Sequence, residues 1–315
     1  MSSAQPSPEE PELWALASGK GGVGRSFLSA NLGFVLARMQ RAVTLVDTDF
    51  GGGNLHTFLG TAGTQAGLDR FLRGEVQQLE SLARPLDLPQ LRLIAGPQEL
   101  GEAPPAARRR QLRQGLRTLS TPLVLLDLAG GCSTPVLELF AQAHKPLLVV
   151  LPEPASVEDA HMFVRRWYGQ RVMQEAGKLG IGPALFRQQV LRGVMPRPPE
   201  LLSRVDALQP GAAHTLHQRL SLQPLSLVLN QVRHISDVTV GLSLKQAMQN
   251  YFELPVRFVG AIGYDAEAWL SARRRRLRAR ESSAETLNRQ LSELIQHLHA
   301  GTELELPDDG HGRDG

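Results

Sequence analysis

Short runs of apolar residues recur along the chain, and segments with helical spacing separate most of them. The runs predict buried strands at Leu13–Ala17, Ala42–Val46, Leu91–Ile94, Leu123–Leu126, Pro146–Val150, Leu225–Leu229 and Val256–Phe258. After the first run, apolar residues at 28, 32, 35, 36 and 39 lie on one face of a helix. The alternation predicts an α/β fold, a mostly parallel sheet of about seven strands flanked by helices on both faces.

The alternation stops in the middle of the chain. No strand is evident from about His161 to Pro224, where two Pro- or Gly-rich stretches separate three helical pieces. Residues 161–224 therefore read as a helical insertion in a single domain spanning 12–300. An amphipathic helix is expected near the end, at Ser282–His299. Residues 1–11 and 301–315 are polar and acidic and are predicted to be disordered tails.

Composition excludes several classes of protein. Of all residues, 42% are hydrophobic, yet no apolar run approaches the roughly 20 residues that cross a bilayer. The start MSSAQPSPEEPE lacks the basic and apolar parts of a secretory signal, so the cytoplasm is the expected compartment. The single cysteine, Cys132, cannot form an internal disulfide or supply a cysteine-rich metal site. A net charge of +3 gives no general case for nucleic acid.

A glycine-rich stretch, SGKGGVGRS at 18–26, joins the first predicted strand to the first predicted helix. It fits the phosphate-loop pattern G-x-x-x-x-G-[K]-[ST], except that Arg25 stands where lysine is expected. Glycines there let successive backbone N–H groups converge on phosphate oxygens at a helix N-terminus. The expected nucleotide-binding residues of the loop are Gly19, Gly21, Gly22, Val23, Gly24, Arg25, Ser26 and Phe27.

Acidic residues follow two of the other predicted strands. Asp47 and Asp49 end the second strand, and Asp127 follows the run Leu123–Leu126. Carboxylates beside a phosphate loop can hold Mg²⁺ through water or orient an attacking water molecule. The predicted metal residues are Ser26, Asp47, Asp49 and Asp127.

Several segments together resemble the deviant Walker A ATPases, the family that includes MinD, ParA and FlhG. Lys20, early in the glycine-rich loop, is the mark of this family. The segments VDTDFGGGNLHTFLG and LLDLAGGCS are similar to its two switch segments, and LPEPASVEDA is similar to its Pro-Glu-Pro-x-Ser helix start. Asn230 in VLNQV resembles its adenine-contacting asparagine, and GAIGYDAEAWLSARRR resembles the late loop that closes over the base.

The resemblance implies an ATP- and ADP-binding, Mg²⁺-dependent switch that forms a homodimer on ATP binding. Lys20 of one subunit would reach the phosphates bound by the other. Asp49 would position the hydrolytic water, Asp127 would sense the phosphate end, and Asn230 would read adenine. Tyr264 and Asp265 would lie in the loop over the base. The implied catalytic residues are thus Lys20, Asp49 and Asp127.

The sequence does not identify the binding partner of the protein or its location in the cell. An unidentified protein partner is expected, with residues 161–224 as a candidate surface. Basic runs at Arg108–Arg110 and Arg273–Arg276 read as solvated helix faces, with an acidic partner, DNA or lipid headgroups as alternatives. The polar face of the C-terminal helix is mixed in charge, so a peripheral position at the inner membrane face is possible but not favoured, and DNA is not expected.

Arg25 makes hydrolysis the open question. Only four of the 34 basic residues are lysines, so Arg25 could reflect a coding bias and still pair with phosphate. Alternatively, the bulkier planar guanidinium slows or abolishes turnover, which is the interpretation slightly favoured here. Phe27 and Ala129 also depart from the family pattern. The alternatives to an ATPase switch are a non-hydrolysing nucleotide-bound adaptor and a small-molecule synthetase of the same fold.

Overall fold

The structure is a computed structural model, and it describes residues 10–62, 67–97, 103–181 and 197–305. Within these residues eight strands form one sheet in the order β3-β4-β2-β5-β1-β6-β7-β8. The strands are β1 Glu12–Ala17, β2 Val43–Thr48, β3 Arg84–Pro85, β4 Leu91–Ile94, β5 Leu123–Leu128, β6 Lys145–Val150, β7 Leu225–Val232 and β8 Val256–Gly263. All pair in parallel except β3, which is antiparallel to β4.

The α/β fold predicted from the sequence is confirmed, and seven of the strands are those predicted. The additional strand, β3, has two residues and lies at the sheet edge. It carries no apolar run, and its Pro85 has no N–H to donate, which suits an edge position. The hydrophobic pattern therefore gave no sign of it.

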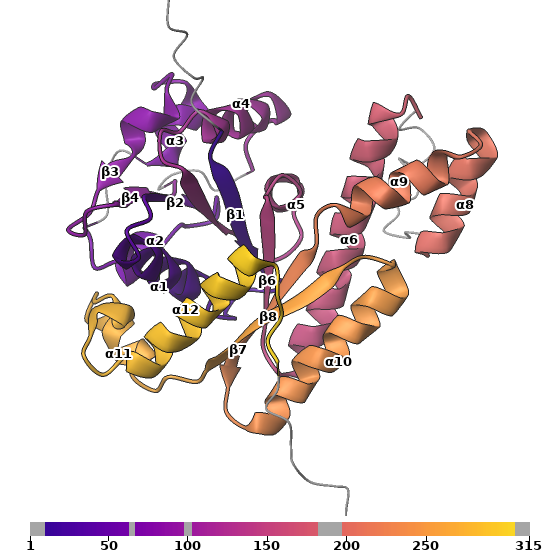
Figure 1. Ribbon diagram of the computed structural model, residues 1–315. Helices are drawn as coiled ribbons and strands as arrows, with labels where there is room; N and C mark the ends of the chain where they lie inside the picture. The colour runs from indigo at the N-terminus through magenta and orange to yellow at the C-terminus, as the bar shows by residue number, and fades with distance from the viewer. Residues whose placement is uncertain (1–9, 63–66, 98–102, 182–196, 306–315) are drawn as a thin grey trace, which may run out of the picture.

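Helices cover both faces of the sheet (Figure 1). They are α1 Arg25–Arg38, α2 Leu55–Phe58, α3 Leu68–Arg73, α4 Ala106–Arg117, α5 Thr134–Phe140, α6 Pro154–Lys178, α8 Pro198–Leu208, α9 Ala212–Ser221, α10 Ile235–Phe252, α11 Ala268–Arg273 and α12 Glu285–Ala300. Two short 3-10 turns are η1 Leu79–Leu82 and η2 Arg278–Arg280. None of the described helices is both long and apolar enough to cross a membrane.

The core has two layers because successive strand residues point to opposite faces. Trp14 and Leu16 of β1 pack with α1 and α12 on one face. Leu13 and Ala15 pack on the other face with α4, α5, α6 and α10. Because all strands but β3 run parallel, the residues that follow them meet at one edge of the sheet, which we call the carboxyl edge.

The segment expected as a helical insertion begins inside a helix. α6 starts at Pro154, so position 161 falls within it. Pro154 suits the first turn of a helix, and the buried Ser156 hydroxyl accepts a hydrogen bond from the N–H of Leu151 at 3.0 Å. α9 packs on α6 and α8, at the end of α6 far from Pro154 (Figure 1). The two expected breaks, at Gly180–Pro183 and Pro196–Pro199, are partly described: α6 ends at Lys178, just before the first, and α8 begins at Pro198, within the second. Residues 182–196 lie outside the described residues.

The expected tails are only partly described. Residues 1–9 and 306–315 lie outside the described part of the chain. Gly301–Glu305, expected to be disordered, instead run beside β8: the N–H of Leu304 donates to the carbonyl of Phe258 at 2.7 Å, and Lys245 pairs with Glu303. The apolar Leu304 and the charge of Glu303 explain why this stretch packs.

Candidate functional site

The glycine-rich loop lies at the carboxyl end of the central strand β1 and leads directly into α1. Gly22 and Gly24 have φ values of 81° and 84°, a left-handed conformation that glycine adopts without strain. Gly24 caps α1, and its carbonyl accepts the N–H of Leu28 at 2.9 Å. The free N–H groups of the first helical turn therefore face the loop, an arrangement that binds anions.

Neighbouring loops pack closely against one side of the glycine-rich loop. A Cβ on Gly19 would lie 2.3 Å from the carbonyl of Asp159 in α6. A Cβ on Gly130, which follows β5, would lie 2.8 Å from the N–H nitrogen of Gly21. By contrast, a Cβ on Gly21 or Gly22 would meet no atom within 4 Å, and both residues are exposed. The loop is thus held in place on one side and accessible on the other.

Asp47 is a buried carboxylate that organises the loop after β2. Its two oxygens accept the backbone N–H groups of Asp49 at 3.1 Å and Leu55 at 3.0 Å. Burial and the nearby Asp127 raise the pKa of Asp47 to about 7. Asp47 therefore shapes the loop Asp49–Asn54, and its role as a magnesium ligand stays a prediction.

Asp127 lies directly beside Asp47, because β5 and β2 pair in register at these residues. Its Oδ1 accepts Nε of Arg25 at 3.2 Å and the hydroxyl of Ser29 at 3.0 Å. The side chain is 1% exposed, and burial raises the pKa of Asp127 while the Arg25 guanidinium opposes that shift.

The Arg25 guanidinium, 8% exposed as a side chain, points into this carboxylate cluster. Besides Asp127, it donates to the Ser18 hydroxyl at 2.9 Å and lies 3.8 Å from Oδ2 of Asp49. Arginine can make these contacts at once because its five donors spread in a planar fork. The interpretation that Arg25 pairs with phosphate stays a prediction.

The oxygen donors near the loop fit Mg²⁺ in kind. Mg²⁺ is usually held by one or two side chains together with phosphate oxygens and water. Asp49 is 31% exposed and Ser26 is the second residue of α1, whereas both oxygens of Asp47 and Oδ1 of Asp127 already accept hydrogen bonds. Among the described residues, no cluster of three or more His, Cys, Asp or Glu could hold a metal alone. A magnesium ion here would therefore depend on the phosphates.

Lys20 lies on the open rim of the loop. Its Nζ is 3.8 Å from Oε2 of Glu153, which precedes α6, and the two side chains are 30% and 60% exposed. An ion pair this long and exposed contributes little. Lys20 is therefore able to leave Glu153 for another anion.

Asn230, near the end of β7, braces the loop from the side. Its Nδ2 donates to the Val23 carbonyl at 2.8 Å, and the residue is 3% exposed. A Cβ on Gly24 would lie 2.4 Å from that nitrogen, so this close approach requires glycine. Contact with adenine stays a prediction for Asn230.

Tyr264 and Asp265 follow β8 on the same edge. The guanidinium carbon of Arg233 lies 3.6 Å from the Tyr264 ring centre, and Tyr264 is 47% exposed. Asp265 accepts Nε of Arg278 at 2.7 Å, and Arg278 is 4% exposed. The described side-chain contacts of both residues thus hold the loop itself and do not reach the glycine-rich loop.

Sequence reasoning missed several contacts of the site. Ser18 and Ser29 bind Arg25 and Asp127, respectively. Ser29 stands four residues after Arg25, hence on the same face of α1, and that spacing could have revealed it. Phe27 packs edge-on against Phe58 of α2, with ring centres 6.4 Å apart.

Comparison with known proteins places this geometry in a family. The model of the CobQ/CobB/MinD/ParA nucleotide binding domain matches residues 14–277. The septum site-determining protein MinD of Synechocystis is 29% identical over 170 residues, 53% of this chain and 61% of that protein. The antiactivator FleN of Pseudomonas aeruginosa is 30% identical over 159 residues, 49% of this chain and 55% of that protein. The match spans about half to three fifths of these relatives.

Solved structures match over nearly the whole chain. The MinC:MinD cell division protein complex of Aquifex aeolicus has a TM-score of 0.60 at 17% identity, covering 94% of this chain and 98% of that one. MinD of Pyrococcus horikoshii, complexed with Mg-ADP, has a TM-score of 0.57 at 17% identity, covering 91% and 96%. At these identities the likeness shows the fold alone. With a matching family model over most of its length, the chain belongs to the CobQ/CobB/MinD/ParA nucleotide-binding domain family.

Proposed function

We propose that this protein is an ATP-binding switch that dimerises on binding nucleotide and thereby regulates or positions a partner protein or assembly. The observation that carries the proposal is the open side of the glycine-rich loop. There the exposed Gly21 and Gly22 and the helix N-terminus after Gly24 face the carboxyl edge, beside Lys20 and Asp49.

Nucleotide phosphates would lie on this loop, with Mg²⁺ held by Ser26 and Asp49. The metal would neutralise charge that develops on the phosphates during hydrolysis. Asp127 and Asp47 would support this arrangement from beneath, since their hydrogen bonds fix Arg25 and the loop Asp49–Asn54. MinD of Pyrococcus horikoshii was solved with Mg-ADP, which supports the choice of ligand.

Dimerisation would use the carboxyl edge. Lys20 is exposed there, and two exposed apolar residues lie on the same edge: Ile235 after β7, 74% exposed, and Tyr264 after β8, 47% exposed. Large exposed apolar side chains favour an interface. Nucleotide bound between two copies would let Lys20 of each reach the phosphates of the other.

Hydrolysis is proposed to be slow. Arg25 can reach phosphate only by exchanging its contacts with Asp127, Ser18 and Asp49. The names of relatives are consistent with control of a partner, since FleN is an antiactivator and MinD forms a complex with MinC.

The test is the molar mass by light scattering, without nucleotide, with ADP and with ATP, each with Mg²⁺. The wild-type protein is expected to double its mass with ATP. Lys20→Ala is expected to bind ATP but to stay monomeric, whereas Lys178→Ala, an exposed lysine on α6, should behave as wild type. If ATP neither binds nor changes the mass of the wild-type protein, the proposal is wrong.

Phosphate release in the same samples distinguishes the remaining alternatives. Slow release with ATP-dependent dimers supports the switch. Dimers without any release indicate a non-hydrolysing adaptor, and rapid turnover only in the presence of a small-molecule acceptor indicates a synthetase.

A further inference from the structure

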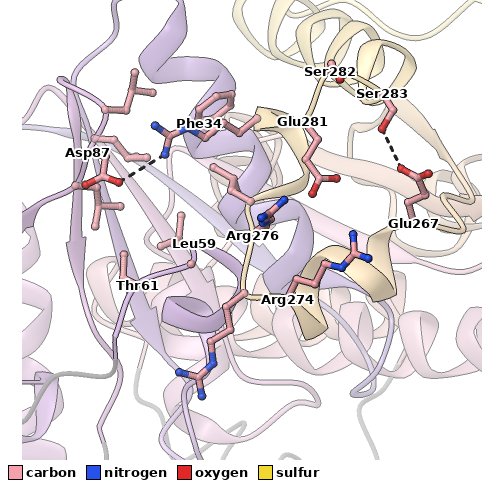
Figure 2. A pocket seen from close by; sticks show the side chains of 17 residues that line it. Phe34, Leu59, Thr61, Asp87, Glu267, Arg274, Arg276, Glu281, Ser282 and Ser283 are labelled. Atoms are coloured by element: carbon pink, nitrogen blue, oxygen red, sulfur yellow. Dashed lines mark hydrogen bonds and ion pairs between the residues drawn. The ribbon is translucent and has the colours of Figure 1, made fainter.

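A second concave site lies away from the glycine-rich loop. It is a groove of about 660 Å³ between the segment after α2, the β3–β4 hairpin and residues 267–283 (Figure 2). This volume is in the range of sites that bind small molecules or peptide side chains. Its apolar lining is Phe34, Leu59, Leu86, Leu88, Leu91 and Leu277.

Unpaired positive charge lines one side of this groove. Arg274, Arg275 and Arg276 are exposed, and within the described residues no ion pair joins them to a carboxylate. The other arginines nearby are engaged: Arg280 lies 3.6 Å from Asp87, and Arg278 binds Asp265 and Glu281. In Figure 2 the side chains of Arg274 and Arg276 stand on the wall opposite Leu59 and Thr61.

We propose that the groove binds an acidic peptide segment of a partner protein. Aliphatic side chains of the peptide would pack on the leucine lining, and its carboxylates would pair with Arg274 and Arg276. The inference rests on the proposed function only in taking the partner to be a protein. Bidentate pairing suits arginine, and apolar contact supplies most of the affinity in such grooves.

The same groove is poorly suited to a continuous polyanion. Asp87, Glu267 and Glu281 also line it and would repel a nucleic-acid backbone or an anionic membrane surface. Its one aromatic side chain, Phe34, is 6% exposed, so no ring is free to stack on a base. The separate carboxylates of a peptide can be placed away from these acids, and the exposed Ser282 hydroxyl can hydrogen-bond a peptide backbone.

Both walls of the groove continue into the nucleotide site. Leu59 and Thr61 follow α2 and thus the loop Asp49–Asn54, while Arg274 follows the loop at Tyr264. The walls touch where a Cβ on Gly60 would lie 2.5 Å from the carbonyl of Arg275. A peptide in the groove would therefore contact the segments that follow the predicted switch and base-covering loops.

The test uses a random dodecapeptide display library selected on the full-length protein without nucleotide. Enriched peptides are expected to combine at least two acidic with aliphatic residues. Synthetic versions, measured by fluorescence anisotropy, should lose at least about ten-fold in affinity with Arg274→Ser/Arg276→Ser. The matched control, Arg108→Ser/Arg110→Ser, removes two exposed or half-exposed arginines from the other basic run and should change affinity less than about two-fold.

Three outcomes would overturn the proposal. The first is that no peptide is enriched, and the second is that enriched peptides bind both double variants equally. The third is that a 20-base-pair DNA or phosphatidylglycerol vesicles bind the wild-type protein and lose binding only with Arg274→Ser/Arg276→Ser. Circular dichroism of both variants confirms that they fold. Because the selection needs no nucleotide, its result is independent of whether ATP drives dimerisation.

Discussion

Arg25 is the residue at which sequence and structure inform each other most. From the sequence it is only an arginine in place of a lysine. In the structure its guanidinium joins the Ser18 hydroxyl, Asp127 and Asp49. A lysine ammonium, a single point charge, could not hold all three groups in this planar arrangement. The substitution therefore changes which groups beneath the loop are linked to one another.

Arg25→Lys is expected to raise phosphate release by about ten-fold or more, because the ammonium is freer to stabilise charge on the phosphates. The measurement is single-turnover phosphate release at saturating ATP. Arg38→Lys, at the exposed end of α1, is the control and should leave the rate unchanged. Rapid release by the wild-type protein would contradict the idea that Arg25 restrains hydrolysis.

The buried Asp47 predicts a pH dependence of stability. Its pKa is about 7 in the folded protein against 3.8 for an ordinary aspartate, so between these pH values the folded state holds a proton that the unfolded state has released. Stability from this group is therefore full below pH 4 and falls as pH rises to 7, by at most about 4 kcal/mol. Urea unfolding of wild type and Asp47→Asn at several pH values checks this, and parallel curves would contradict it.

How far the site could be predicted depended on the kind of residue. Gly19–Ser26, Asp47, Asp49 and Asp127 are clustered as expected, because the carboxyl ends of parallel strands must meet at one edge. The direction of each side chain could not be predicted. Phe27 turns toward Phe58, and Asp265 toward Arg278, because packing between elements distant in sequence decides these rotamers.

Among the elements, α6, α8 and α9 make up the region that the sequence predicts to be helical. Arg171 in α6 holds them: it is 6% exposed and donates to the carbonyls of Leu220 at 2.9 Å and Gln223 at 3.4 Å. These carbonyls lie at and just beyond the C-terminus of α9, where helical partners are missing. Burial lowers the pKa of Arg171 to about 10, so it stays charged at neutral pH.

Arg171→Met leaves these carbonyls without a hydrogen-bond donor. The variant is therefore expected to loosen α8 and α9 from α6 and to lower the local free energy of unfolding by about 2–3 kcal/mol. Hydrogen exchange of residues 198–221 should accelerate while exchange in β1 and β5 stays slow. Lys178→Met, whose side chain is 63% exposed in the wild type, serves as the control. Uniform acceleration over the whole chain would show instead that Arg171 supports the core.

Some boundaries of helices and strands could be predicted from the sequence and others could not. The seven parallel strands were predicted from their apolar runs, whereas the two-residue β3 had none. The segment LPEPASVEDA predicted a helix start, and α6 begins within it at Pro154. The length of α6, 25 residues, could not be predicted, because its polar and apolar residues show no clear helical period.

At the scale of the whole molecule, two helical layers enclose one sheet, and the loops that follow its parallel strands converge at the carboxyl edge. The fold thereby brings a phosphate loop, two acidic loops and the loops after β7 and β8 together. The groove lined by Arg274 and Arg276 continues into segments that reach this edge, so a nucleotide and a peptide would contact adjoining segments. Binding free energies linked in this way are necessarily reciprocal.

The contact between Gly19 and Asp159 has a mechanical consequence. The first turns of α6 pack directly against the glycine-rich loop, and the helix extends over 25 residues, about 37 Å, to the helices α8 and α9. A displacement of the loop toward α6 would therefore displace the whole helix. Gly19→Ala is expected to alter hydrogen exchange in α9 even without nucleotide, whereas Gly21→Ala, with open space around it, should not. If both variants match wild type, α6 does not carry motion from the loop to its distant end.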